Sequence, residues 1–416
     1  MNDDPATLLT PRGQEILARL AAEGVGQDGA GLALATRLRR EYPAALVAQA
    51  MAQQELRRSA AAKFSRAAEM LFTRAGYEQS SSETVARHRA VRLTGAGRVA
   101  DLCCGIGGDL TALAGASEVL AVDRDETHAR LARHNAAVYG GGGAVRAVVA
   151  DVRDVRLAGC DAVFIDPARR SAAGAAPARG AHGDRRFRPG TSEPSLNWCV
   201  ALADDVPAVC VKAAPGLPRD LIPAGWEAEF IAEGRELKEA VLWSPPLATA
   251  PAAGQGSGRG PRRATILEAA RAGGTPEAHT LVAHDGAPVP VREPGDYLLD
   301  PNPAVTRAGL VEDLARELGG DVAKVDPQIA FLTLDRNVRT PFARTLRVQH
   351  SAPWNEKRFA KSLRDLGIGA VDIRRRGLAG DVDQIRRRLK LSGTRRATVV
   401  ITRVSDKPWG LICADQ

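Results

Sequence analysis

Residues Val99–Gly108 read VADLCCGIGG, and this stretch decides the fold of the chain. Its apolar start predicts a buried strand that ends at Asp101. The three glycines that follow predict a turn with room for a ligand against the backbone. The next segment, Asp109–Ala114, favours a helix whose first N–H groups would face that ligand. The stretch therefore predicts a site for a nucleotide-like cofactor.

The spacing of these glycines excludes two common nucleotide sites. A dinucleotide turn of the G-x-G-x-x-G kind needs a third glycine where this chain has Leu110. A phosphate-binding loop of the Walker kind needs a Gly-Lys-Ser/Thr sequence, which does not follow. The pattern that remains, D-x-x-x-G-x-G, is typical of S-adenosylmethionine sites.

Three further strands are predicted downstream, and an acid follows each of them. The pairs are Glu118–Val122 with Asp123, Ala144–Ala150 with Asp151, and Asp161–Ile165 with Asp166. With a helix predicted over Thr127–Tyr139, this order is typical of an α/β domain with a parallel sheet. Ligands bind at the carboxyl edge of such sheets, so we expect the acids to surround the cofactor. A single such acid is more often only a solvated turn residue.

Several stretches resemble the methyltransferase core of the trimethylguanosine synthases and their bacterial relatives. They are VADLCCGIGGDLTALA from Val99, VLAVDRDETHARLARHNAAVYG from Val119, DAVFIDP from Asp161, and the upstream helix Ser82–His88. The resemblance covers roughly residues 60 to 245. It implies a Rossmann-like class I core that binds S-adenosylmethionine and methylates a guanine exocyclic amine in RNA.

The resemblance also implies which residues hold the cofactor. Asp101, Gly105 and Gly107 would contact its methionine end, Asp123 its ribose, and Asp151 its adenine. The candidate cofactor-binding residues are Asp101, Cys103, Gly105, Gly107, Asp123, Arg124, Asp151 and Val152.

The fourth motif departs from the family pattern. The family has Ser-Pro-Pro-Trp, whose tryptophan stacks on the cap base, whereas this chain has Asp166-Pro167-Ala168-Arg169. The missing aromatic residue argues against cap hypermethylation. We expect Asp166 and Pro167 to be catalytic, because the carboxylate and the proline carbonyl would accept hydrogen bonds from a target NH2 and aim its lone pair. The alternative is that Asp166 only shapes the cofactor pocket.

The cysteines and histidines indicate no second chemistry. Methylation through a cysteine needs a thiolate at the base, and Asp166–Arg170 holds no cysteine. Cys103 and Cys104 lie in the glycine turn, where packing is the simpler role. The six cysteines and seven histidines form no C-x-x-C or H-x-x-x-H pair, so we expect neither a metal site nor a disulfide framework.

Four segments are predicted along the chain. They are an N-terminal helical subdomain at 1–90, the methyltransferase core at 91–262, a connector at 263–340 with a helix over 304–318, and an α+β domain at 341–416. The strand and helix order of the last segment resembles the THUMP-like domains attached to some bacterial methyltransferases. THUMP domains bind RNA, so the resemblance implies an RNA-binding module.

The charge of the chain agrees with an RNA partner. The net charge is +8, and much of the excess lies in residues 341–416. Such a surface attracts phosphates whatever their sequence. The arginine-rich loop at 169–188 would add phosphate contacts beside the methyl-transfer edge. An ordinary solvated surface, and disorder of the loop tip, are the alternative explanations.

The sequence shows neither a secretory signal nor a run of about 18 apolar residues. With scattered cysteines, this predicts a cytoplasmic protein that has no membrane partner. The favoured function is an S-adenosylmethionine-dependent methyltransferase acting on a base amino group in RNA. The alternatives are methylation of DNA, protein or a small molecule, and a non-catalytic RNA-binding protein with a vestigial cofactor pocket.

Overall fold

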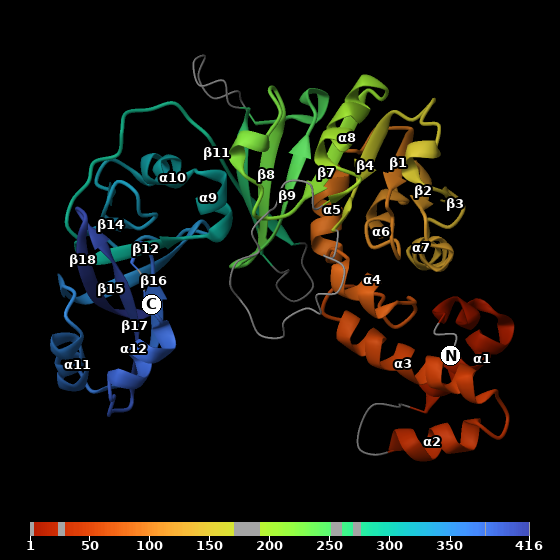
Figure 1. Ribbon diagram of the computed structural model, residues 1–416, viewed down its shortest axis with the longest axis horizontal. Coiled ribbons are helices and arrows are strands. Elements are labelled where there is room, and N and C mark those ends of the chain that lie inside the picture. The colour runs from red at the N-terminus through yellow and green to blue at the C-terminus, as the bar shows by residue number, and fades with distance from the viewer. Residues whose placement is uncertain are drawn as a thin grey trace. The chain divides into compact units, whose positions relative to one another are not determined.

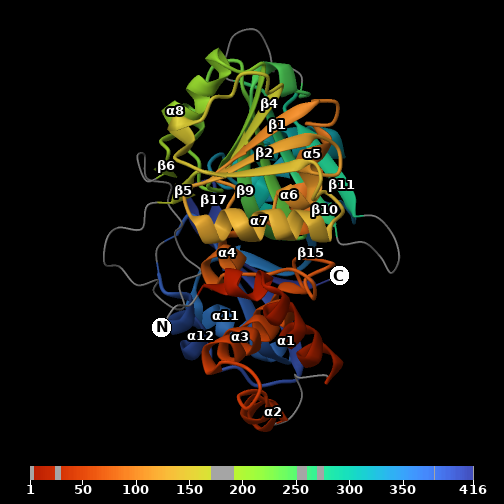
Figure 2. The same ribbon diagram turned by 90° about the vertical axis from the view of Figure 1, so that its right-hand side faces the viewer.

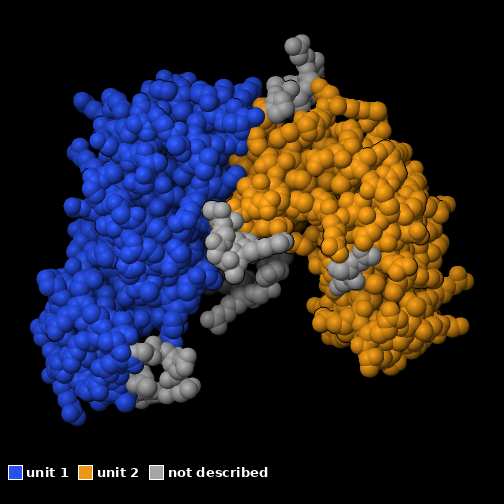
Figure 3. Space-filling model, turned by 180° about the vertical axis from the view of Figure 1, so that it is seen from behind, with its two compact units in different colours: residues 1–227, 238–249 blue, residues 228–237, 250–416 orange. Residues whose placement is uncertain are grey.

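A computed structural model describes residues 4–23, 30–169, 192–250, 260–268, 276–378 and 380–415 (Figure 1). The chain forms two compact units (Figure 3). Unit 1 holds residues 1–227 and 238–249, and unit 2 holds residues 228–237 and 250–416. Each unit has its own buried core and is described by itself.

Unit 1 begins with helices. They are η1 (Pro5–Leu9), α1 (Pro11–Ala22), α2 (Ala30–Leu38), α3 (Ala44–Ala60), α4 (Arg74–Gln79) and α5 (Glu83–Val91). α1 begins after Thr10, whose hydroxyl accepts a hydrogen bond from the N–H of Gly13. The apolar sides of η1, α1, α2 and α3 pack into one core that also includes Ile106 of the glycine turn. The N-terminal helices are therefore joined to the predicted cofactor site by packing.

The sheet of unit 1 has the strand order β9-β7-β4-β1-β2-β3. The strands are β1 (Arg98–Leu102), β2 (Glu118–Asp123), β3 (Val145–Val149), β4 (Ala162–Ile165), β7 (Ala208–Ala213) and β9 (Glu236–Trp243). Neighbouring strands are parallel except β9, which is antiparallel to β7. β1 lies between β2 and β4, so the order of the strands reverses at β1, and in sheets of this kind ligands bind at the carboxyl end of such a reversal.

Helices and short elements follow these strands. They are α6 (Leu110–Leu113), α7 (Glu126–Val138), η2 (Val152–Asp154), β5 (Ala168–Arg169), β6 (Ser192–Glu193), α8 (Leu196–Ala201), η3 (Leu202–Asp204), η4 (Arg219–Leu221) and η5 (Pro245–Leu247). α7 packs against β2 and β3, and Figure 2 shows α7 beside the strands of the unit 1 sheet. The predicted helices at 109–114 and 127–139 are confirmed as α6 and α7. β4 is buried along its whole length, as expected for a strand of a parallel sheet covered on both faces.

Unit 2 begins with three strands and two helices. They are β8 (Glu227–Glu233), β10 (Arg262–Glu268), β11 (Glu277–Val282), α9 (Pro303–Ala308) and α10 (Val311–Leu318). The prediction of a single helix over 304–318 is wrong, because two helices cover this segment. Gly309 takes a φ of 71°, and this left-handed residue ends α9, after which α10 starts in a new direction.

The second sheet of unit 2 has the order β13-β14-β12-β15-β18-β17-β16. Its elements are β12 (Tyr297–Pro301), β13 (Ala323–Lys324), β14 (Leu332–Leu334), β15 (Ala343–Pro353), α11 (Glu356–Asp365), β16 (Ile368–Arg375), α12 (Val382–Arg388), β17 (Arg395–Val404) and β18 (Lys407–Asp415). Phe359 of α11 and Ile385 of α12 share one core cluster with Val399 of β17. Both helices therefore cover the same face of this sheet. The predicted α+β order of the C-terminal part is confirmed.

Candidate active site at the carboxyl edge of the sheet

The glycine turn is built from residues with positive φ. Cys103, Gly105 and Gly107 have φ of 60°, 52° and 81°. A Cβ on Gly107 would lie 2.7 Å from Cα of Ala132, so α7 packs directly against the turn there. A Cβ on Gly105 would meet nothing within 4 Å. The turn is thus closed on its α7 side and open at Gly105, where a ligand can approach the backbone.

Asp123 stabilises this turn. Its Oδ2 accepts the N–H of Gly105 at 2.9 Å, and its Oδ1 accepts the N–H of Asp125 at the same distance. Nδ1 of His128 lies 3.9 Å from Oδ1. A carboxylate has about four lone-pair sites. Asp123 therefore keeps acceptor capacity beside the open part of the turn.

Asp101 is the least satisfied group of the site. Its side chain is buried, and in the described part of the chain neither carboxylate oxygen has a hydrogen-bond partner. Burial raises the pKa of Asp101 well above its usual value, and the charges of Asp109 and Asp166 raise it further. A buried carboxylate without partners is costly. It fits a ligand that brings a cation or N–H donors to the turn.

The other predicted cofactor residues lie at the same edge. Arg124 follows β2 and is exposed, whereas Val152, which follows β3, is buried. Asp151 pairs with Arg153 over 3.1 Å and also accepts its backbone N–H. Arg153 forms a second ion pair with Glu193. The structure brings these residues to one side of the sheet, with Asp151 already paired to an arginine.

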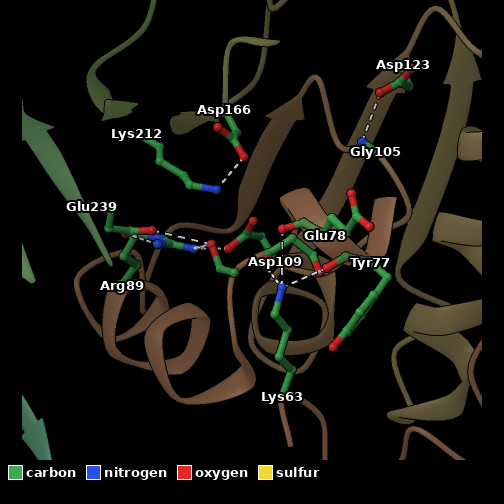
Figure 4. Close-up of polar contacts among 12 residues, drawn as sticks. Lys63, Tyr77, Glu78, Arg89, Gly105, Asp109, Asp123, Asp166, Lys212 and Glu239 are labelled. Atoms are coloured by element: carbon green, nitrogen blue, oxygen red, sulfur yellow. Dashed lines mark hydrogen bonds and ion pairs between the residues drawn. The ribbon is translucent and has the colours of Figure 1, made fainter. Parts of the chain in front are cut away.

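Asp166 carries a partner that the sequence did not predict. It follows β4, and its backbone N–H donates to the carbonyl of Leu102 at 3.2 Å. Nζ of Lys212 lies 2.5 Å from Oδ2 of Asp166 (Figure 4). The only sequence signal was a lysine at the end of the apolar stretch PAVCVKA. The structure thus places a cation beside the predicted catalytic acid.

Arg89 was also missed by the sequence analysis. It is buried on α5 and forms ion pairs with Asp109 and Glu239, as Figure 4 shows. Its guanidinium also donates to the hydroxyl of Ser81 at 3.0 Å. Burial alone would lower the pKa of Arg89, but the two carboxylates outweigh it and raise the pKa. This network ties α5 to the start of α6 and to β9.

The charges at this edge favour a cationic ligand. The interacting groups are the carboxylates of Asp101, Asp109, Asp123, Asp166 and Glu239 and the cations Arg89 and Lys212. Acids outnumber cations in this cluster, so a ligand with positive charge would lower the repulsion among them.

The cysteines near the site are neutral thiols. Burial raises the pKa of Cys103 and Cys104, and it raises the pKa of Cys199 to about 12. The thiolate is the nucleophilic form of cysteine. The described cysteines therefore offer no activated nucleophile at this edge.

The arginine-rich loop predicted at 169–188 lies outside the described residues, apart from the backbone of Arg169. A cavity of about 340 Å³ in unit 1 is lined by Arg98, Glu118 and Arg146 among others, at the opposite, amino end of the strands.

Within the described ranges, no group of three or more His, Cys, Asp or Glu residues could hold a metal ion. None of the described helices combines the length and the hydropathy that a membrane span requires.

Three family models match parts of the chain. A family model described as RNA cap guanine-N2 methyltransferase matches residues 96–186. A model described as THUMP domain-like matches residues 343–415, and a domain of unknown function matches residues 2–60.

Two curated proteins and one solved structure are similar over most of the chain. The proteins come from Mycobacterium tuberculosis strains CDC 1551 / Oshkosh and ATCC 25618 / H37Rv, and each is named an uncharacterized S-adenosylmethionine-dependent methyltransferase. Each is 36% identical over 363 residues, which cover 84% of this chain and 90% of the relative. The crystal structure of a candidate methyltransferase from Porphyromonas gingivalis W83 has a TM-score of 0.70 at 20% identity, covering 97% of this chain and 98% of that one. This last likeness concerns the fold.

Proposed function

Because this chain belongs to the family of S-adenosylmethionine-dependent methyltransferases that includes the two mycobacterial proteins, we propose that it methylates a base amino group in RNA. The cofactor would bind at the carboxyl edge of the unit 1 sheet. The observation that carries the proposal is the pair of acids at the strand reversal: among the described residues buried Asp101 has no hydrogen-bond partner, and Asp166 follows the adjacent strand.

The cofactor fits the residues that are present. Asp101 would receive the α-ammonium group of the methionine end, which supplies the missing partner of its carboxylate. Gly105 would let the ligand lie against the turn, because a Cβ built there would meet nothing within 4 Å and a side chain would occupy the open space. The spare lone pairs of Asp123 would accept the ribose hydroxyls, and Asp151 would accept the adenine amino group. Cys103, Gly107, Arg124 and Val152 would line the same pocket.

The chemistry needs few protein groups. S-adenosylmethionine supplies a methyl group that its sulfonium already activates for transfer. Asp166 and the carbonyl of Pro167 would accept the two N–H groups of the target amine and so orient its lone pair. Catalysis of this kind is largely positioning. The neutral cysteines argue against methylation through a cysteine adduct.

A basic surface on unit 2 supports RNA as the substrate. α11 and α12 cover one face of the C-terminal sheet, and their outward sides are rich in exposed cations. These residues, which we call the basic helical face, are Lys357, Arg358, Lys361, Arg364, Arg386, Arg387 and Arg388. Arg388 pairs with Glu356 over 3.1 Å and links the two helices. Such a surface would bind phosphates without reading the sequence.

The experiment compares possible substrates directly. The purified full chain is incubated with methyl-labelled S-adenosylmethionine and with separate RNA, DNA and protein fractions from a strain that lacks the gene. We expect label in the RNA fraction alone. Label in DNA or protein would move the activity to that substrate. Binding of S-adenosylmethionine, measured by calorimetry, separates an inactive preparation from a chain that does not bind the cofactor.

A further inference from the structure

Lys212 and Asp166 form a donor and an acceptor that stand side by side. β4 and β7 are parallel with Ile165 opposite Val211, so the two residues that follow are neighbours at the edge of the sheet. Their side chains are only 13% and 32% exposed, and Nζ donates to Oδ2 over 2.5 Å. In the described part of the chain, Oδ1 of Asp166 and the other two N–H groups of Lys212 form no hydrogen bond. Oδ1 of Asp166 therefore stays available as an acceptor, and the ammonium of Lys212 beside it stays available as a donor.

The surroundings keep Lys212 protonated. Burial alone would lower the pKa of Lys212, but the charges of Asp166, Glu239 and Asp109 together outweigh burial and raise it. Arg89 is the cation that opposes these three acids. A protonated lysine donates hydrogen bonds and cannot take a proton from a hydroxyl group. This pair is therefore suited to binding a substrate acceptor, and not to activating an O–H group for methylation.

Building on the proposed function, we infer that Asp166 and Lys212 read the substrate base together. Asp166 accepts from the amino group that becomes methylated, and Lys212 donates to the ring nitrogen beside it. The substrate is thus a base whose amino group stands next to an unprotonated ring nitrogen. Adenine offers this pair as N6 with N1, cytosine as N4 with N3, and guanine as N2 with N3. Such edges are accessible in unpaired RNA.

The same pair excludes other edges. The Watson–Crick edge of guanine places N1–H beside the amino group, and this proton would face the ammonium of Lys212. Uracil has no amino group for Asp166 to hold. Asp166 and Lys212 therefore distinguish between bases: a bidentate contact of one acceptor and one donor gives roughly 5- to 150-fold discrimination.

The first test identifies the labelled nucleoside. RNA methylated by the wild-type chain is digested, and the labelled nucleoside is identified by mass spectrometry. We expect methylation on an exocyclic nitrogen of adenosine, cytidine or guanosine. Label on a ribose oxygen, a ring nitrogen or a ring carbon would overturn the inference while RNA methylation itself still held. Absence of label from RNA would instead overturn the proposed function together with this inference.

The second test removes the ring nitrogen. An oligonucleotide carries the target base with that nitrogen replaced by C–H, as in 1-deazaadenosine for adenosine or the 3-deaza analogues of guanosine and cytidine. We expect wild-type kcat/KM to fall roughly tenfold or more. Lys212→Met should lower kcat/KM on the natural oligonucleotide by a similar factor. On the deaza oligonucleotide its kcat/KM should equal that of the wild type. Lys212→Arg keeps a hydrogen-bond donor, so it should again prefer the natural oligonucleotide to the deaza analogue.

Two results would overturn the role of Lys212. Either the wild-type chain treats both oligonucleotides alike, or Lys212→Met keeps the full discrimination. Calorimetry with S-adenosylmethionine and thermal melting of each variant show whether the cofactor site and the fold are intact. The comparison of the two oligonucleotides on the wild-type chain needs no variant, so it decides the question even where Lys212→Met does not fold.

Discussion

Nδ2 of Asn135 donates to the carbonyl oxygen of Ile106 over 2.8 Å, and this contact ties α7 to the glycine turn. The side-chain amide of Asn135 also accepts a hydrogen bond from the N–H of Leu71 and donates one to its carbonyl oxygen, both at 2.9 Å. Gln53 of α3 does the same for the next residue, Phe72. Two buried amides thus join residues 71–72 to α3, to α7 and to the glycine turn.

Asn135→Ala should destabilise the chain. Three buried backbone groups, on Leu71 and Ile106, would lose their partner, and each unsatisfied group costs about 1–3 kcal/mol. Because some of these groups can recover partners on relaxation, we expect a loss on the order of 2–3 kcal/mol in urea unfolding. Arg133→Ala, at an exposed position of the same helix, is the control and should change stability by less than about 0.5 kcal/mol. Equal effects of the two variants would contradict the role of Asn135.

Asp101→Asn should have opposite effects on the stability of the chain and on its affinity for S-adenosylmethionine. The buried carboxylate costs free energy when it is ionised without a partner, so its removal should raise the melting temperature of the cofactor-free chain at neutral pH. The same change should weaken S-adenosylmethionine binding about tenfold or more, because a charged partner is lost. Thermal melting and calorimetry measure the two effects. The exposed Asp205→Asn is the control and should move neither. A variant that binds the cofactor as tightly as the wild type would show that Asp101 is not its partner.

Cofactor affinity should rise with pH. The folded-state pKa of Asp101 is raised, so without ligand the protonated form persists to higher pH than usual. A cationic ligand favours the ionised form, so binding releases a proton. Affinity should therefore fall as pH drops through the raised pKa and level off above it. Calorimetry in buffers of different ionisation enthalpy measures the released proton. A pH-independent affinity, or the same pH dependence in Asp101→Asn, would refute this linkage.

The basic helical face should govern RNA affinity. Lys357 and Lys361 lie one helical turn apart on α11 and are exposed. Replacing both with Gln should weaken RNA binding and reduce the slope of log K against log salt by about 0.7–0.9 per lost phosphate contact. The matched control replaces exposed Arg39 and Arg40, which removes the same charge from another surface. Equal losses in the two double variants would point to a general charge effect without a defined RNA surface.

Local patterns predicted much of the fold. The strand, turn and helix around Val99–Gly108 were predicted correctly because an apolar run, three glycines and a helix-forming segment lie close together in the sequence. The parallel order, the α+β C-terminal part and the membership of a methyltransferase family are confirmed as well. The assignment of individual residues to cofactor and substrate stays a prediction.

What the sequence could not reveal depends on long-range register. Lys212 meets Asp166 only because β7 is adjacent to β4, and Glu239 meets Arg89 across 150 residues. No local pattern encodes such pairs. Asn135 was part of a stretch noted for family resemblance, but its partners on Leu71 and Ile106 become evident only in the folded chain. The prediction of one helix over 304–318 was wrong because Gly309 adopts a left-handed conformation that ends α9, although the composition of the segment favours a helix.

The measurement that tests the account most directly compares the wild-type chain with Asp166→Asn in a single turnover. Both are saturated with labelled S-adenosylmethionine and mixed with RNA from the deletion strain. We expect the wild type to label RNA, and the variant to transfer about 100-fold more slowly, as a misplaced acceptor would. Cofactor affinity of the two chains should agree within about threefold, because Asp166 positions the amine. Equal rates of RNA labelling would contradict the central claim that Asp166 positions a base amine for methyl transfer.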